Sequence, residues 1–454
     1  MRLAGGPGGE PTIVSIVGVV LLPFIGTRDA ALGLRLTCRE LKQAVTDFPW
    51  EDMGTVIQGS IALWRACFPR ATGANVSKFF SFDQDPNARR APLCDADCVH
   101  FVGLRALDMS LCRAVTDAAF VHLRGIKRLN MTYCRQVTDA AFVHLKGIQR
   151  LNMRACDQDT ITDAAFEHLK GIQELDMEAC SQATITDAAF AHLKGIQKLN
   201  MRACWQDTIT DAAFNHLQGI DELDMSECTQ ATITDAAFVH LKGIHTLDVS
   251  FCRQLTSAAF EHLRGIQKLD MWGCNQDTIT DAAFAHLKGI HTLKVTNCTQ
   301  ITDAAFEQLR GVKELSISGC SQLTDAAFEH LGGIQNLSME GCGQVSDAAF
   351  VHLAGIQKLK MNRCNQATLT DAAFEHLKGI RKLFMNGCSQ PSITSAAFVH
   401  LRGIGELSIR ECNQATITAA AFEHLVGIKK LCMYGCSADK VQAAVDLNLP
   451  VDLS

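Results

Sequence analysis

The chain has 454 residues, of which 47% are hydrophobic and 20% charged, so its composition is that of a large folded protein and excludes general disorder. Its 42 Lys and Arg residues against 48 Asp and Glu residues give a net charge of -6, which argues against a chain-wide basic surface for nucleic acid. Twenty cysteines are too sparse for a small disulfide scaffold, so their positions must decide their role.

The N-terminal segment begins with ten residues that contain four glycines and one proline, and residues 1–10 are predicted to be a disordered leader. The apolar run from Ile13 to Ile25 is shorter than the roughly 18 residues that a membrane-spanning helix needs. Its Gly/Pro-rich lead and the lack of a small-x-small cleavage site argue against a signal peptide. We therefore expect neither a membrane partner nor secretion.

Residues 11–50 lack the periodicity of the later chain and are predicted to form a small helical domain. Ile13–Ile25 and Asp29–Val45 are the two predicted helices. The second helix has one apolar stripe, made of Ala30, Leu34, Cys38 and Leu41.

Residues 51–92 are predicted to be a linker and a capping repeat. Ile61–Phe68 has the pattern of a helix, and Ala71, Ala74 and Val76 then follow at the spacing of a short strand. This is the pattern of the repeats that come next, with Phe79 in place of their cysteine. We expect a cryptic additional unit that covers the exposed edge of the first repeat.

A sequence similar to TDAAFVHLKGIQRLNMRAC recurs from Leu93 to Cys436, so residues 93–436 are one array of repeats. Each unit has one marker cysteine at its end, and successive marker cysteines are 22 or 24 residues apart. The two extra residues lie in a loop before the Thr-Asp pair. These fifteen cysteines are Cys112, Cys134, Cys156, Cys180, Cys204, Cys228, Cys252, Cys274, Cys298, Cys320, Cys342, Cys364, Cys388, Cys412 and Cys436.

Each unit is predicted to begin with a short helix. Thr116 is a hydroxyl N-cap, and Asp117 places a negative charge at the positive end of the helix. Ala119, Phe120 and Leu123 then fall on one face. A glycine ends the helix.

A short strand follows the glycine. Ile126, Leu129 and Met131 have the spacing of inward apolar residues, whereas Asn130 and Thr132 point the other way. Neither the helix nor the strand can bury its apolar side alone. Stacked units solve this problem if their strands line up as a parallel sheet.

The repeat pattern resembles the cysteine-containing subclass of leucine-rich repeats, in which C is followed by two to four residues, I-T-D, small and apolar residues, and LxLxxC. The resemblance covers about three quarters of the chain. It implies an α/β solenoid with parallel strands on its inner side and short helices outside. Residues 437–454, which include DKVQAAVDLNL, are predicted to be the C-terminal cap.

The segment DAALGLRLTCRELKQAV followed by FPW resembles the second half of an F-box, and Leu21–Ile25 resembles the end of its first helix. The opening Leu-Pro is absent, and Leu41 stands where a tryptophan is expected. The resemblance implies binding of a Skp-family adaptor. A plain capping helical bundle is the alternative. The implied adaptor-binding residues are Leu21, Leu22, Pro23, Leu34, Leu36, Cys38 and Leu41.

The regular cysteines and histidines are interpreted as packing residues. Each repeat cysteine has the same strand-end position, where a small apolar side chain can pack and bond a turn carbonyl. Fourteen of the sixteen histidines precede the helix leucine, whereas a catalytic histidine is expected once. Cys94, Cys98 and His100 suggest a zinc half-site until they are aligned with the repeat, where they take ordinary repeat positions.

No catalytic constellation stands out. The glutamine two residues after the repeat cysteine is expected to bond turn backbone groups. The sequence has no phosphate-binding G-x-x-x-x-G-K-[ST] loop and no G-x-S-x-G elbow. We therefore predict a non-enzyme without cofactor or metal.

The inner face is where the units differ. Its charges alternate in sign from the third to the sixth unit, which favours either cross-strand support or ligand binding. Three aromatic residues at outward strand positions are candidate hot spots. The predicted substrate-binding face comprises Arg154, Glu178, Arg202, Asp248, Trp272, Lys294, Lys360, Phe384, Arg410 and Tyr434.

Together these patterns predict the substrate-recognition subunit of an SCF-type ubiquitin ligase, with a Skp-family adaptor, a cullin core and an unknown protein substrate as partners. Such a subunit accelerates transfer by holding its target close. The alternative is a scaffold or decoy without ubiquitin chemistry, and a third interpretation is an extracellular ectodomain. We expect a monomer outside the complex, and matched free thiols favour the cytoplasm or nucleus, which are reducing.

Overall fold

The computed structural model describes residues 39–57, 59–77 and 93–453. They fall into two compact units, Met1–Gln218 and Gly219–Ser454, and each is considered by itself. The predicted leader, the first predicted helix and most of the second lie outside the described residues.

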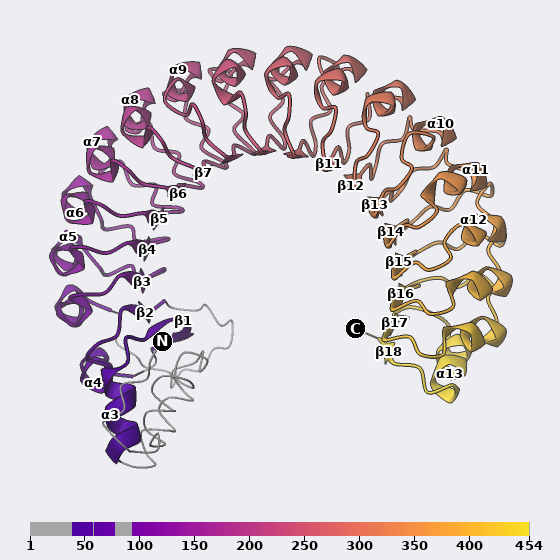
Figure 1. Ribbon diagram of the computed structural model, residues 1–454, viewed down its shortest axis with the longest axis horizontal. Helices are drawn as coiled ribbons and strands as arrows, with labels where there is room; N and C mark the ends of the chain where they lie inside the picture. Colours follow the sequence, from indigo (N-terminus) through magenta and orange to yellow (C-terminus); the bar gives the residue numbers. More distant parts are fainter. Residues whose placement is uncertain (1–38, 58, 78–92, 454) are drawn as a thin grey trace, which may run out of the picture. The chain divides into compact units, whose positions relative to one another are not determined.

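Unit 1 alternates short helices with three-residue strands (Figure 1). Its strands are β1 (Glu51–Val56), β2 (Gly73–Asn75), β3 (Ala106–Asp108), β4 (Arg128–Asn130), β5 (Arg150–Asn152), β6 (Glu174–Asp176) and β7 (Lys198–Asn200). Its α-helices are α3 (Arg39–Asp47), α4 (Ile61–Cys67), α5 (Asp117–Phe120), α6 (Asp139–Phe142), α7 (Asp163–Phe166), α8 (Asp187–Phe190) and α9 (Asp211–Phe214). Its 3₁₀ helices are η3 (Asp95–Phe101), η4 (Val121–Leu123), η5 (Val143–Leu145), η6 (Glu167–Leu169) and η7 (Ala191–Leu193).

Unit 2 repeats the same plan and ends in a longer helix and a last strand. Its strands are β8 (Glu222–Asp224), β9 (Thr246–Asp248), β10 (Lys268–Asp270), β11 (Thr292–Lys294), β12 (Glu314–Ser316), β13 (Asn336–Ser338), β14 (Lys358–Lys360), β15 (Lys382–Phe384), β16 (Glu406–Ser408), β17 (Lys430–Cys432) and β18 (Val451–Asp452). Its helices are η8 (Asp235–Leu241), η9 (Ser257–His262), η10 (Asp281–His286), η11 (Asp303–Gln308), α10 (Asp325–Phe328), α11 (Asp347–Phe350), η12 (Val351–Leu353), α12 (Asp371–Glu375), η13 (Ser395–Leu401), η14 (Ala419–Leu425) and α13 (Ala438–Asp446).

Within each unit the sheet is parallel, and every strand pairs with the next one along the chain. Leucine faces leucine in the register, as Leu129 faces Leu151 in unit 1 and Leu293 faces Leu315 in unit 2. The strands line the inner side of each unit, and the helices lie outside them (Figure 1). This is the predicted leucine-rich-repeat solenoid, in which the stacking of repeats buries apolar side chains that a single repeat cannot bury alone.

The core lies between the strands and the helices. Phe120 and Phe284 have no exposed surface, and Leu129 and Met131 are also buried. The helices are single turns because the Thr-Asp cap opens them and Gly125, with φ +85°, turns the chain back toward the strand.

The N-terminal edge extends further than the sequence analysis predicted. β2 is the strand of the expected cryptic unit and pairs with β3, but β1 pairs with β2 as a further, unpredicted strand. Trp50, which the F-box resemblance had assigned to the helical domain, is buried. Its ring packs edge-on against Phe68, and its Nε1 donates to the Val45 carbonyl. The segment from α3 to Trp50 therefore packs with the capping strands.

The C-terminal edge is covered by α13, where the sequence predicts a capping helix, and by β18, which pairs with β17. Lys440 of α13 is buried, and its Nζ donates to the carbonyls of Cys412 and Gln414. The ammonium group of Lys440 thus donates to turn carbonyls that would otherwise accept hydrogen bonds from a further repeat.

Candidate functional site

The outer side of each unit is tied together by a ladder of Asp and Thr residues. Thr186 caps α8 by accepting from Ala188 N, as predicted. The aspartate has a further role, because Asp163 accepts from both the backbone N and the Oγ1 of Thr186, each at 2.7 Å. The same pair of bonds recurs along the array. The Thr-Asp pair is therefore an inter-repeat clamp, a link between neighbouring repeats, rather than a reactive site.

The cysteines form a second ladder. Cys180 Sγ lies 3.2 Å from the Met153 carbonyl, and Cys274 Sγ lies 3.1 Å from the Val249 carbonyl. Burial raises the pKa of Cys274 to about 12, so its thiol stays protonated. The 19 cysteines among the described residues are all free, and within those residues no group of His, Cys, Asp or Glu is arranged to hold a metal ion.

The glutamines form a third ladder, as the sequence analysis predicted. Gln276 Nε2 donates to the carbonyls of Cys252 and Leu255 in the preceding repeat. The histidines of the outer helices are half-buried, and two of them accept hydrogen bonds from arginines: Arg124 donates to His144, and Arg402 donates to His424. These regular residues are therefore structural in the part of the chain that the structure describes.

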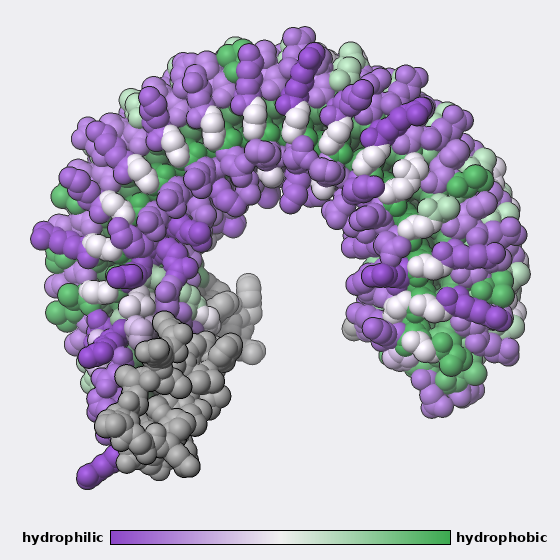
Figure 2. All heavy atoms as spheres, in the orientation of Figure 1, coloured by the Kyte–Doolittle hydropathy of each residue, from purple (hydrophilic) through white to green (hydrophobic). Residues whose placement is uncertain are grey.

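The inner side of each unit, here called the strand face, carries three rows of outward side chains per strand. They are a first row (Lys358 in β14), a middle row (Lys360) and a turn row (Asn362) two residues beyond the strand. Figure 2 shows hydrophilic residues along the inner rim of each unit, where the strands lie. The strand face is thus the surface on which composition varies.

From β3 to β10 the middle row is used by the fold itself. Its residues are Asp or Asn, and their side-chain oxygens accept from the backbone of the turn row. Asn130 Oδ1 accepts from Thr132 N at 3.1 Å, and Asp248 Oδ1 accepts from Ser250 N at 2.9 Å. Asp248, a predicted binding residue, therefore has a turn-forming role.

Asp248 is half-buried between neighbouring aspartates in register, Asp224 and Asp270. Burial is the main reason that its pKa is raised to about 6, although the bonds from Ser250 oppose the shift. Asp270 is neutralised on its other side, where its Oδ2 lies 2.6 Å from Lys294 Nζ. The hydrogen bond to Asp270 raises the pKa of Lys294.

Three predicted binding residues of unit 1 are paired with one another. Arg154 lies 3.0 Å from Glu178, and Arg202 lies 3.9 Å from the same carboxylate. The alternation of charge noted in the sequence is therefore cross-strand support here. Ligand binding at these three residues stays a prediction.

The predicted aromatic residues differ in exposure. Tyr434 is 57% and Trp272 45% exposed, and the Trp272 ring packs at a tilted angle against Phe251, with ring centroids 4.9 Å apart. Phe384 is only half-buried rather than fully outward, and Lys358 Nζ lies 5.9 Å from its ring centroid. The sequence analysis missed Trp205, which is 56% exposed just beyond Cys204.

From β11 onward the strand face changes. From β11 to β17 the middle row has no Asp or Asn and contains Lys294, Ser316, Ser338, Lys360, Phe384, Ser408 and Cys432. Two hollows of about 390 and 580 Å³ lie side by side on these strands. Lys294 and Lys360 line the smaller hollow, and Arg410 lines the larger one.

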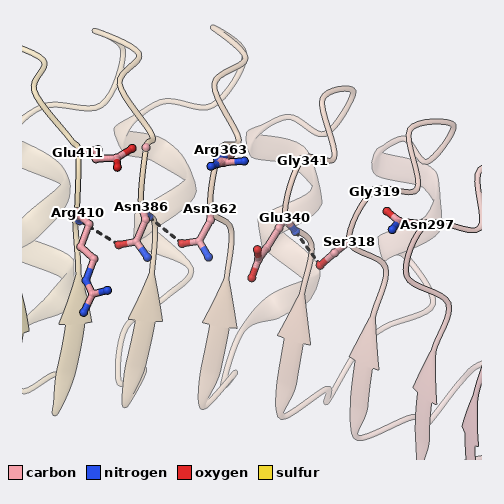
Figure 3. Close-up of a pocket in the computed structure, with 11 residues that line it drawn as sticks. Asn297, Ser318, Gly319, Glu340, Gly341, Asn362, Arg363, Asn386, Arg410 and Glu411 are labelled. Atoms are coloured by element: carbon pink, nitrogen blue, oxygen red, sulfur yellow. Dashed lines mark hydrogen bonds between the residues drawn. The ribbon is translucent and has the colours of Figure 1, made fainter. Parts of the chain in front are cut away.

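The larger hollow, here called the turn groove, lies along the turn row (Figure 3). Sequence reasoning found only Arg410 among its residues. The signal available in the sequence was a pair of asparagines in the turn row of consecutive units and glycines beside them. The turn groove is lined by Asn297, Ser318, Gly319, Glu340, Gly341, Asn362, Arg363, Asn386, Gly387, Arg410 and Glu411.

The structure pairs Lys360 of β14 with Phe384 of β15 in register, and Arg410 lies two residues beyond the end of β16. Of the predicted adaptor-binding residues, Leu21, Leu22, Pro23, Leu34, Leu36 and Cys38 lie outside the described residues, and Leu41 is in α3. No helix in the described part of the chain has the length and apolar character needed to cross a membrane.

Comparisons with known proteins agree with this architecture. A model of the BspA type leucine rich repeat region matches residues 110–221, 207–335 and 321–443. The chain therefore belongs to the leucine-rich-repeat proteins of this type. Comparison with curated protein sequences gives no match.

Solved structures with the same fold include the Drosophila Toll–Spatzle complex, with a TM-score of 0.55 and 16% identity over 76% of this chain and 50% of that one. The TLR13–ssRNA13 complex has a TM-score of 0.53 and 15% identity over 87% of this chain and 64% of that one. The chain thus spans about half the length of the Toll chain that it matches. At this identity the likeness concerns the fold alone.

Proposed function

We propose that this leucine-rich-repeat protein is a non-enzymatic binding subunit that holds a partner protein on the strand face of β11–β16. The observation that supports this proposal is the change in the middle row, where the Asp and Asn residues that form turns are replaced by residues such as Lys360 and Phe384. Side chains that the fold does not require are free to contact a partner. The Toll structure is itself a complex with Spatzle, which supports a protein ligand for this fold.

We further propose that the partner is a substrate presented to an SCF-type ubiquitin ligase. This step rests on the resemblance of the N-terminal segment to an F-box, which implies a Skp-family adaptor and a cullin core. The chain would supply no reacting group, because proximity of the bound target to the conjugating enzyme gives the rate gain. A reducing compartment, cytoplasm or nucleus, fits the free thiols.

The adaptor proposal is tested by affinity capture from eukaryotic cells. The full chain should recover a Skp-family adaptor, and a variant that lacks residues 11–38 should not. The deletion ends before α3 because Trp50 and Val45 belong to the buried edge, so that loss of the adaptor is not caused by unfolding. Equal recovery by both proteins, or none by the full chain, would reject the adaptor role.

The binding face is tested in the same captures. Phe384→Ala combined with Lys360→Glu should lose the target while keeping the adaptor. Trp205→Ala is a matched control, because it removes an exposed aromatic residue that is not on the strand face. A target retained by the double variant would place binding elsewhere.

A scaffold or decoy without ubiquitin chemistry is the second candidate. The observation that favours it is the burial of Trp50, because a residue that the F-box resemblance uses is here part of the capping edge. Capture of a target without any adaptor would support the scaffold or decoy role.

A further inference from the structure

Two asparagines of the turn groove, Asn362 and Asn386, have fixed amide orientations. Asn362 Oδ1 accepts from Asn386 N at 2.8 Å. Asn386 Oδ1 accepts from Arg410 N at 2.9 Å and from Ser408 Oγ at 2.6 Å. Only an oxygen can accept these bonds, so both NH₂ groups must occupy the other side of each amide, away from the backbone bonds (Figure 3). Adjacent strands thus present two oriented donors.

The turn groove exists because the residues beside these donors are small. Gly319, Gly341 and Gly387 stand at left-handed positions where other repeats have larger side chains, such as Tyr133. The lining runs from Asn297 after β11 to Arg410 after β16. Five strand spacings of about 4.8 Å give a length of about 24 Å, which matches about seven residues of extended chain.

Cations without an ion-pair partner lie in the groove and beside it. In the described part of the chain, Lys360, Arg363 and Arg410 have no carboxylate within ion-pair distance, whereas Lys382 is paired with Glu406 at 2.8 Å. Arg410 Nε is buried and has no hydrogen-bond partner among the described residues. Arg363 and Arg410 line the groove together with Glu340 and Glu411, and Lys360 adds a third cation from the neighbouring hollow.

We propose that the turn groove binds an extended acidic segment of a partner protein. Backbone carbonyls of the segment accept from the amides of Asn362 and Asn386, and its carboxylates pair with Arg410 in the groove and with Lys360 in the neighbouring hollow. Donors of fixed orientation and unpaired cations favour acceptors and negative charge over basic or apolar chains. This inference rests on the proposed function, since it assigns the chemistry of the segment that the strand face holds.

The test uses the full chain and a fluorescein-labelled peptide of twelve residues that alternates Asp and Ser, followed by anisotropy. We expect this peptide to bind at low salt and weaken as salt rises, while a Lys–Ser peptide of equal length does not bind. Asn362→Asp keeps the acceptor for Asn386 N but turns the donor into a carboxylate oxygen. It should weaken binding at least tenfold, and Arg410→Gln about tenfold.

The matched control is Asn130→Asp, the same exchange in the middle row of unit 1, where Asn130 Oδ1 accepts from Thr132 N. It adds the same charge and should leave the affinity within about twofold. Binding of both peptides alike, no binding of the acidic one, or equal losses in Asn362→Asp and Asn130→Asp would overturn the proposal. Displacement by inorganic phosphate at concentrations below those of unlabelled peptide would also overturn it, by indicating a small-anion site.

The peptide test and the target captures can reject the two proposals independently of each other. If Phe384→Ala with Lys360→Glu loses the target but Asn362→Asp retains it, the strand face binds a partner and the acidic-segment inference is wrong. If the acidic peptide binds as expected while no variant loses a target, the groove chemistry holds and the proposed function fails.

Discussion

Residues at one turn position are held in the left-handed region in nearly every repeat. Ala179 has φ +57° and Phe251 has φ +61°, although the position favours glycine. Where a large side chain stands there, the next repeat often has glycine. Phe251 lies over Gly273, and Asn297 lies over Gly319, where an added Cβ would collide. At these two places the large residue in one repeat therefore fits only beside a glycine in the next.

Gly273→Ala should destabilise unit 2 for two reasons. Its φ of +71° disfavours alanine, and the new Cβ would lie 2.5 Å from the Phe251 ring. We expect a loss of about 2–4 kcal/mol in the free energy of unfolding, measured by urea denaturation. Gly265→Ala is the control, because its φ is also positive, at +88°, but the space around it is open. Its loss should be only about 1 kcal/mol, and equal losses would contradict the packing argument.

Asp248→Asn should stabilise the protein above pH 6. The folded pKa of Asp248, about 6, lies above the ordinary 3.8, so ionisation costs more in the folded state. The penalty is absent below about pH 4, grows between pH 4 and 6, and reaches about 2–3 kcal/mol at neutral pH. Asparagine keeps the turn bonds, as Asn130 shows. A stability gain that does not change between pH 4 and 7 would contradict this account.

At the scale of elements, neighbouring repeats are joined, beyond the pairing of their strands, by three kinds of side-chain hydrogen bond: Asp with Thr, Cys with a backbone carbonyl, and Gln with a backbone carbonyl. The sequence predicted the elements and their buried faces, because apolar spacing fixes them. It did not predict that Asp163 bonds the following repeat. A cap residue and an inter-repeat clamp have the same local sequence, and only the three-dimensional stacking distinguishes them.

Asp163→Ala should therefore cost more than the loss of a helix-end charge. Thr186 would lose the acceptor for both its N–H and its hydroxyl, and we expect about 2–4 kcal/mol, measured as the shift in urea midpoint. Asp163→Ser should cost less. The chain itself has serine at this place twice, where Ser257 Oγ accepts from Thr280 N at 2.9 Å and Ser395 Oγ accepts from Thr418 N at 2.8 Å. Equal costs for Ala and Ser would mean that the clamp contributes little.

At the scale of the whole molecule, the sequence predicted the solenoid but only part of its candidate site. Periodicity identifies the buried rows, so the remaining rows follow by exclusion. The sequence does not show whether an outward charged residue is ion-paired with a neighbouring strand. Arg154 and Glu178 neutralise each other, whereas Arg410 has no ion-pair partner among the described residues. The turn groove was missed because it depends on glycines that remove side chains and on amides that are oriented by neighbouring strands.

The buried thiols should make both units sensitive to alkali. Burial raises the pKa of Cys156, Cys274 and Cys412 to about 12, while an unfolded thiol titrates near 9. Below pH 9 these thiols are neutral in both states and stability is unaffected. Above it the unfolded chain loses protons that the folded chain keeps, so each thiol removes up to about 1.4 kcal/mol per pH unit.

Urea midpoints measured between pH 8 and 11 should therefore fall steeply. Replacing these three cysteines by alanine should lower stability at pH 8, because each alanine leaves a cavity and removes a thiol–carbonyl contact. The same variant should reduce the alkaline slope by up to about 4 kcal/mol per pH unit. Cys94→Ala is the control, since Cys94 is exposed and should not alter the slope. An unchanged slope in the triple variant would show that lysines and tyrosines, not the thiol ladder, cause the alkaline unfolding.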